Sequence, residues 1–259
     1  MPPDFPPADW RDPARYAPLL RAESWALAWE WLRRDPGYRA AAVPGRARAE
    51  GSRRPAMLEP DEAAARWGLH AFEDPALAVP LARPVWRAEQ HSRVLAVAAA
   101  TPKGAADCFE LERFAALSTI AADARAEHLL ISDGVRGVRL DVLEGTLLRG
   151  PRRLAWRPSG LRELDTQLGA AGDLLRLWKT GSFGPPCAGP RNVRIVLLLR
   201  AWDALAAGAN QRDIAQLLSR ERLPGRWRSE VPSLRSRAQR LVRGARAMAR
   251  GGYRALLAG

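Results

Sequence analysis

The last third of the chain carries an apolar periodicity that restricts it to a group of packed helices. The pattern predicts one helix over residues 195–207, a turn at Gly208, a short helix over residues 211–218 and a long helix over residues 233–249. In the long helix, apolar side chains recur every three or four residues and arginines fill the positions between them. We therefore expect residues 191–259 to form a C-terminal helical domain.

Most of the positive charge of the chain lies in the same segment. The 259 residues carry a net charge of +13, and residues 191–259 hold 15 arginines against four acidic residues, a net charge of +11. A basic domain beside a nearly neutral one indicates a polyanionic partner. Nucleic acid is the first expectation and an anionic membrane surface the second. No apolar run approaches the roughly 20 residues of a membrane helix, so we expect no membrane partner.

Two amphipathic helices around a glycine turn, followed by an arginine-rich helix, have the outline of a helix-turn-helix that binds double-stranded DNA. Ala215 supplies the small residue needed where the helices cross, and Asn210 can cap the short helix. The unit is divergent, because the 14 residues 219–232 separate the short helix from the long one. We expect Trp227 to anchor this insert.

Nine side chains of this unit are the candidate DNA contacts. Early residues of a recognition helix reach base edges and later ones meet the backbone, and arginine can donate two parallel hydrogen bonds to phosphate or guanine. The residues assigned to bases are Arg235, Ser236 and Arg237, with Arg240 next. The residues assigned to the phosphate backbone are Gln211, Arg212, Arg226, Arg228 and Arg243.

Residues 1–42 predict a small helical unit. Its helix over residues 25–34 places Trp25, Trp29 and Leu32 on one face, which we interpret as core, with a groove for a partner protein as the alternative. Residues 43–60 lack periodicity and are rich in Pro, Gly and Arg, which predicts a linker.

Residues 61–190 predict an α+β domain, so the whole chain is assigned to the α+β class. A buried strand is expected at residues 93–100, and residues 128–156 alternate with a period of two around an Asp-Gly turn, which predicts a small antiparallel β-meander. A helix over residues 161–179 follows. Its predicted buried stripe consists of Leu164, Leu168, Leu175 and Trp178.

Sequence motifs for catalysis or cofactor binding are absent. His70, His91 and His128 lie in different segments and predict no metal pair. Cys108 and Cys187 have no metal-ligand spacing, and together with the lack of a secretory signal they favour a reduced, cytoplasmic protein. We expect no enzymatic activity, no cofactor and no metal.

Several segments carry a family resemblance. Residues 203–215 (DALAAGANQRDIA), 234–243 (LRSRAQRLVR) and 251–253 (GGY) resemble the C-terminal domain of a proteobacterial family typified by RovC, an activator of type VI secretion genes. The hairpin and residues 177–183 (LWKTGSF) look similar, so the resemblance covers about residues 90–257. It implies promoter binding, transcriptional activation and oligomerisation.

A second resemblance concerns the N-terminal unit. Residues 9–12 (DWRD) and 28–39 (AWEWLRRDPGYR) resemble a small transcriptional-regulator-like domain that often precedes the RovC-like domain. The sequence thus predicts a bacterial transcriptional regulator that binds promoter DNA, an activator acting as a homo-oligomer, with RNA polymerase or another regulator as a further partner. Dimer binding to a repeated site is expected, because single modules seldom give enough specificity.

Two alternatives compete with this interpretation. An antiactivator or adaptor would use its basic face to bind an acidic partner protein instead of DNA. RNA binding is disfavoured because no aromatic stacking platform lies among the arginines. Affinity for promoter DNA across a salt series separates these classes, since only nucleic-acid binding releases condensed counterions.

Overall fold

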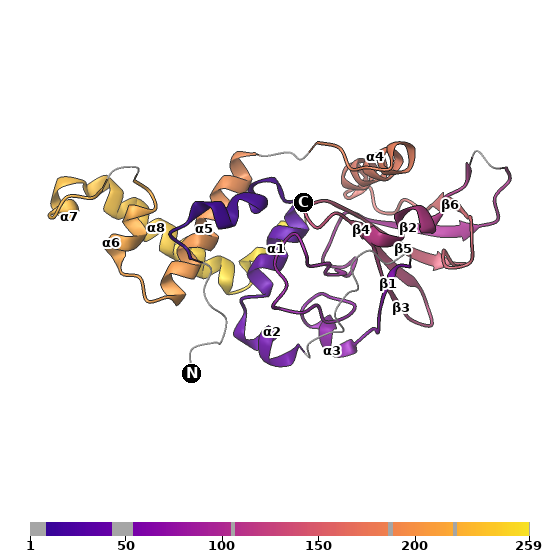
Figure 1. The fold of residues 1–259 in the computed structure, drawn as a ribbon, viewed down its shortest axis with the longest axis horizontal. Helices are drawn as coiled ribbons and strands as arrows, with labels where there is room; N and C mark the ends of the chain where they lie inside the picture. Colours follow the sequence, from indigo (N-terminus) through magenta and orange to yellow (C-terminus); the bar gives the residue numbers. More distant parts are fainter. Residues whose placement is uncertain (1–8, 43–53, 105–106, 186–188, 220–221, 259) are drawn as a thin grey trace.

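The computed structural model describes residues 9–42, 54–104, 107–185, 189–219 and 222–258 (Figure 1). A β-sheet with helix α4 (Leu164–Thr180) lies at one end of the molecule, and helices α6 (Gln211–Gln216), α7 (Trp227–Glu230) and α8 (Pro232–Ala249) lie at the other. The N-terminal helices lie between the two ends. None of the described helices combines the length and the apolar composition that crossing a bilayer requires.

The N-terminal unit consists of the 3-10 helix η1 (Pro13–Arg21), α1 (Ser24–Leu32) and α2 (Pro36–Ala41). Asp12 and Asp35 cap η1 and α2 through their carboxylates, and a proline begins each helix with a backbone already fixed for that position. Helix α1 is buried on every side, and Trp25 and Trp29 are 2% and 0% exposed. The interpretation of these tryptophans as core is confirmed.

Within the described ranges, six strands form one mixed sheet in the order β1-β3-β4-β5-β2-β6. The strands are β1 (Ala56–Leu58), β2 (Val94–Ala100), β3 (Ser118–Ala122), β4 (Glu127–Ser132), β5 (Gly137–Glu144) and β6 (Arg153–Trp156). The predicted hairpin is confirmed as β4 and β5, and β2 confirms the predicted buried strand. Strands β1 and β2 pair in parallel with β3 and β5, so the predicted antiparallel meander over residues 128–156 is wrong as a description of the sheet.

The difference arises because β2 inserts between β5 and β6, which are neighbours in sequence but not in space. Strand β1 also falls inside the segment predicted as a linker, of which residues 43–53 lie outside the described part. Three residues are too few to show an alternating pattern. Short elements α3 (Glu62–Ala65) and η3 (Leu111–Leu117) complete this part.

The two faces of the sheet belong to different cores. Leu129, Ile131 and Leu140 point to the face covered by α4 and η3, where Ala170 and Leu177 of α4 are buried. The predicted buried stripe of α4 is partly wrong, because Leu168 and Leu175 remain 52% and 49% exposed. Apolar residues occur on both sides of this helix, so periodicity alone did not identify the buried face.

The second core joins segments from the two ends of the chain. Helix α5 (Pro190–Ala206) packs against η1 and α8, and the 3-10 helix η4 (Gly252–Leu256) packs against α1 and α8. Trp29 and Tyr38 of the N-terminal unit share one hydrophobic cluster with Leu199 and Leu241. Residues 9–42 and 190–258 therefore hold each other in place.

Candidate nucleic-acid interface

Helix α6 follows α5 through a tight turn at Gly208, whose φ of +79° lies in the left-handed region that favours glycine. The Asn210 carboxamide accepts hydrogen bonds from the N–H groups of Arg212 and Asp213, and the Asp213 carboxylate accepts one from the Asn210 N–H. This capping box confirms the predicted cap. Ile214 and Ala215 are fully buried, and α6 packs against α5 and α8.

The insert after α6 is fastened to that helix. The Arg212 guanidinium donates hydrogen bonds to the carbonyls of Leu223 (2.6 Å) and Gly225 (3.3 Å). The Gln216 side chain accepts one from the Leu223 N–H at 3.1 Å. Trp227, at the start of α7, is only 3% exposed, so the expectation that it anchors the insert is confirmed. The insert thus reaches α8 as an ordered connection over residues 222–231.

Helix α8 separates its side chains cleanly into two faces. Leu234, Ala238, Leu241 and Ala245 are buried against α5 and α6. The helix contains no acidic residue, and its five arginines are all exposed: Arg235, Arg237, Arg240, Arg243 and Arg246. None of the five forms an ion pair within the described residues. The face is a run of uncompensated guanidinium groups.

The structure gathers the predicted contact residues at one end of the molecule, on or beside α6, α7 and α8 (Figure 1). Ser236 is exposed near the start of α8, and Arg226 is exposed immediately before α7. Arg228 belongs to α7, but its side chain lies outside the described part of the structure. Gln211 begins α6, where the next two backbone amides are already bound by Asn210.

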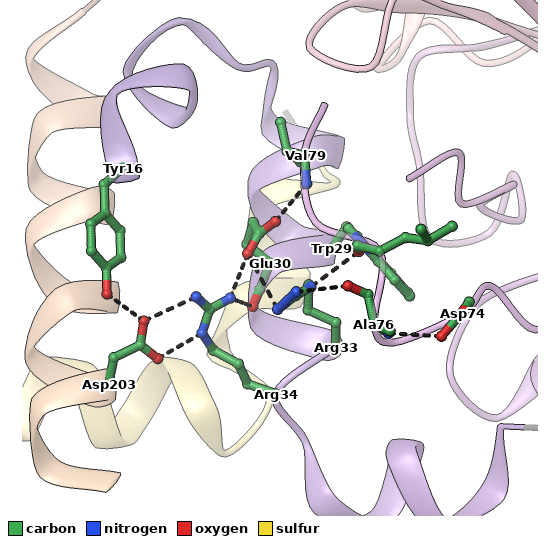
Figure 2. Close-up of polar contacts among 10 residues, drawn as sticks. Tyr16, Trp29, Glu30, Arg33, Arg34, Asp74, Ala76, Val79 and Asp203 are labelled. Carbon is green, nitrogen blue, oxygen red and sulfur yellow. Dashed lines mark hydrogen bonds and ion pairs between the residues drawn. The ribbon is translucent and has the colours of Figure 1, made fainter. Parts of the chain in front are cut away.

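A buried polar network fixes α5, which supports α8, to the N-terminal unit (Figure 2). Asp203 of α5 accepts hydrogen bonds from the Tyr16 hydroxyl at 2.6 Å and from Nε and Nη2 of Arg34 at 2.7 and 2.9 Å. Arg34 also pairs with Glu30, whose other carboxylate oxygen accepts from the Val79 N–H at 2.8 Å. The network therefore links three segments that are distant in sequence.

Charges within this network are mutually stabilised. Burial alone would lower the pKa of the Arg34 guanidinium, but Asp203 and Glu30 more than offset that effect and raise it. Burial, together with the negative charge of Asp203, raises the pKa of the Tyr16 hydroxyl well above its usual value. Burial lowers the pKa of neighbouring Arg33 to about 10. Its attraction to Glu30, at 3.9 Å, offsets only part of the effect of burial. At neutral pH Arg34 and Asp203 form a buried ion pair with Tyr16 as a neutral donor.

Sequence reasoning missed this network, because its members are up to 187 residues apart and no local pattern marks them.

Sequence reasoning also placed His70 and His128 in unrelated segments, whereas the structure stacks their rings with centroids 3.5 Å apart and planes 19° apart. His128 Nδ1 lies 2.6 Å from the Asp141 carboxylate, which Arg139 also approaches at 2.8 Å. Near-parallel imidazoles do not aim two lone pairs at one point, so we interpret this cluster as a buried polar network.

Two family models match segments of the chain. Residues 159–258 match a model described as the DNA-binding domain of a type VI secretion transcription factor, of the RovC type. Residues 9–70 match a proteobacterial transcriptional regulator-like domain. Comparison with curated proteins found no match. The predicted arrangement of two domains is confirmed, although the C-terminal match begins after the β4–β5 hairpin rather than near residue 90.

Proposed function

We propose that this DNA-binding transcriptional regulator, which joins a regulator-like domain to a RovC-type DNA-binding domain, activates transcription by binding promoter DNA as a homo-oligomer. Helix α8 would read the DNA within a divergent helix-turn-helix. The observation that carries the proposal is the face of five exposed arginines on α8, which form no ion pair with the described residues and lie inside the segment that matches the DNA-binding domain. Such a face attracts the phosphate backbone and offers bidentate donors to guanine.

Each predicted contact residue has a place in this proposal. Arg235, Ser236 and Arg237 lie in the first turns of α8 and would reach base edges, with Arg240 one turn later. The residues that would meet phosphates are Gln211, Arg226, Arg228 and Arg243. Arg212 would act indirectly, because its guanidinium already holds the carbonyls of the insert. The insert then sets the angle at which α8 approaches the groove.

The protein partner of an activator would meet a surface other than the tryptophans of α1. Trp25, Trp29 and Trp31 are at most 2% exposed and offer no groove. RNA polymerase or another regulator remains the expected partner, and contact with either would explain activation once the protein is bound beside a promoter.

The proposal is tested by titrating the purified full chain against its own upstream DNA at several salt concentrations. We expect log K to fall linearly with log salt, with a slope of about −0.9 for each phosphate contact. R235A and R237A should each cost roughly 1–3 kcal/mol on the preferred site and reduce the preference for it. R243A should weaken all sequences alike. R125A removes the same charge from an exposed turn of the sheet and serves as the matched control.

The opposite results would contradict the proposal. Binding that does not depend on salt, or that R125A weakens as much as R237A does, would remove α8 as the DNA-reading element. Absence of any preference among promoter fragments, together with tight binding to another regulator, would favour the antiactivator or adaptor.

A further inference from the structure

Helix α4 presents an apolar stripe to the outside of the molecule. It covers one face of the sheet, and its other side points away from the rest of the chain (Figure 1). Along that outer side, intervals of three and four residues separate five exposed positions: Asp165, Leu168, Gly172, Leu175 and Lys179. Leu168 and Leu175 are 52% and 49% exposed. This spacing is that of helices which pack along one another in parallel or antiparallel pairs.

Gly172 lies in the middle of the stripe, and no packing contact with the described part of the chain requires a glycine there. A glycine inside a helix costs about 1 kcal/mol relative to alanine. A Cβ built at Gly172 would meet no heavy atom within 4 Å, so no neighbouring element of the same molecule requires its absence. A glycine between two exposed leucines instead allows the backbone of another helix to approach closely.

Charges at the two ends of the stripe are opposite in sign and symmetrically placed. Asp165 lies seven residues before Gly172 and Lys179 seven residues after it. Both are exposed, and neither has an ion-pair partner among the residues that the structure describes. Asp173, the other acid of this helix, already pairs with Arg93. A surface with this arrangement is complementary to a copy of itself turned end for end.

We propose that α4 packs against α4 of a second copy of this chain in an antiparallel pair, with the twofold axis beside Gly172. Leu168 of each helix then contacts Leu175 of the other. Asp165 of each helix comes to Lys179 of the other, which gives two ion pairs per dimer. A twofold interface uses the same patch on both subunits, as this self-complementary stripe requires.

The expected dimer is weak. A 17-residue helix is about 25 Å long, so one helix pair falls below the roughly 1,200 Å² of total buried surface typical of stable complexes. Leu175 also lines a recess of about 200 Å³ with Leu154 and Leu174, so the apolar surface continues toward the edge of the sheet. This continuation extends the interface beyond the helix pair.

This inference rests on the proposed function for its biological purpose, because it names the surface that forms the proposed homo-oligomer. Association of two copies through α4 is measured without DNA, so a negative result for this association is distinguishable from a negative result for DNA binding. If the protein binds promoter DNA but stays monomeric, DNA binding through α8 stands, whereas the homo-oligomer and the α4 interface are wrong.

The test is light scattering of the full chain over a range of protein concentrations. We expect the mass to rise from one chain toward two, and L168E/L175E to hold it at one chain over the same range. L81E/L148E places the same two charges on leucines that are 60% and 47% exposed elsewhere, and should dimerise like the original protein. Circular dichroism identifies any variant that fails to fold.

Charge reversal tests the antiparallel orientation. D165K opposes like charges across the pair and should weaken the dimer, whereas D165K/K179D restores opposite charges and should recover it. In a C108S/C187S background, a mixture of L168C and L175C should form a mixed disulfide dimer on oxidation. A monomer at all concentrations, a dimer that L168E/L175E leaves intact, or disulfides only between identical variants would overturn the proposal.

Discussion

His91 shows how burial alone can set the behaviour of one residue. Its side chain is 4% exposed, and neither ring nitrogen has a hydrogen-bond partner among the described residues. Burial, and then the positive charges of Arg139 and Arg93, lower its pKa to about 3. Burial, and then the positive charge of Arg139, also lower the pKa of His70 to about 3. Both imidazoles are therefore neutral in the folded protein at any ordinary pH.

Because the folded protein keeps both imidazoles neutral, its free energy of unfolding depends on pH in the acidic range. In the unfolded chain histidine has a pKa near 6.5, so between about pH 6.5 and pH 3 the unfolded state binds protons that the folded state does not. The free energy of unfolding should fall as the pH drops through that window, by about 1.4 kcal/mol per pH unit for His91. H91L removes the ionisable ring and should reduce the slope by that amount. The contribution of His70 to the slope should remain.

Urea unfolding at several pH values between 7 and 5 measures this slope. A slope that is equal in H91L and the original protein would show that His91 is protonated in the folded state. The sequence did not indicate this effect, because the burial of residue 91 depends on strands and loops that assemble around it.

At the scale of elements, one buried ion pair joins the segment after α1 to α5. Arg34 follows α1, Asp203 lies on α5, and their side chains are 10% and 7% exposed. Removal of one partner from a buried pair costs about 3–5 kcal/mol, because the charge that remains keeps only its second contact, with Glu30 for Arg34 and with the Tyr16 hydroxyl for Asp203. The intact pair therefore stabilises the fold by less than the free energy that is lost when one partner is removed.

A double-mutant cycle tests this view. R34A and D203A should each lower the free energy of unfolding by about 3–5 kcal/mol, and R34A/D203A by less than the sum, because the double variant leaves fewer uncompensated charges. R157A is the matched control, since its ion pair with Glu144 lies at the surface and its loss should change stability little. Additive losses in the double variant would show that the two residues act independently.

Elements differ in how far local sequence determined them. Helices α6 and α8 were predicted within two residues, because α6 carries its cap and α8 its amphipathic period locally. Helix α5 was predicted from its apolar run, but it begins at Pro190, before the predicted start at residue 195. The β4–β5 hairpin was predicted from its Asp-Gly turn. The parallel pairing of β1 with β3 and of β2 with β5 was not predicted, because 44 or more residues lie between the paired positions and leave no periodic signal. For the candidate DNA-binding face, the exposed arginines were predictable, but the fastening of the insert by Arg212 was not.

At the scale of the whole molecule, the two matched segments are not independent modules. Asn192 and Arg200 of α5 donate hydrogen bonds to backbone carbonyls of the N-terminal unit, at Leu20, Ala22 and Trp10. Near the C-terminus, the Leu257 carbonyl accepts from the Ser92 N–H. The shared core then covers apolar faces that either segment alone would expose to water.

A fragment of residues 159–259, the extent of the matched DNA-binding domain with one added residue, should therefore fold poorly. Without η1 and α1, the buried side chains Ile195 and Val196 lose their cover. We expect a broad thermal transition, dye binding to exposed apolar surface and weak DNA binding, all relative to the full chain. A sharp transition with full promoter affinity would show that the C-terminal segment is autonomous.

The shared core also affects how the chain folds during synthesis. During synthesis, α1 leaves the ribosome about 158 residues before α5 begins, and at about 5–20 residues per second this interval is roughly 8–30 s. For that period Tyr16 and Arg34 lack Asp203, their shared partner, and η1 lacks α5, the helix against which it packs. We therefore expect the yield of folded regulator to depend on the speed of translation between the two segments.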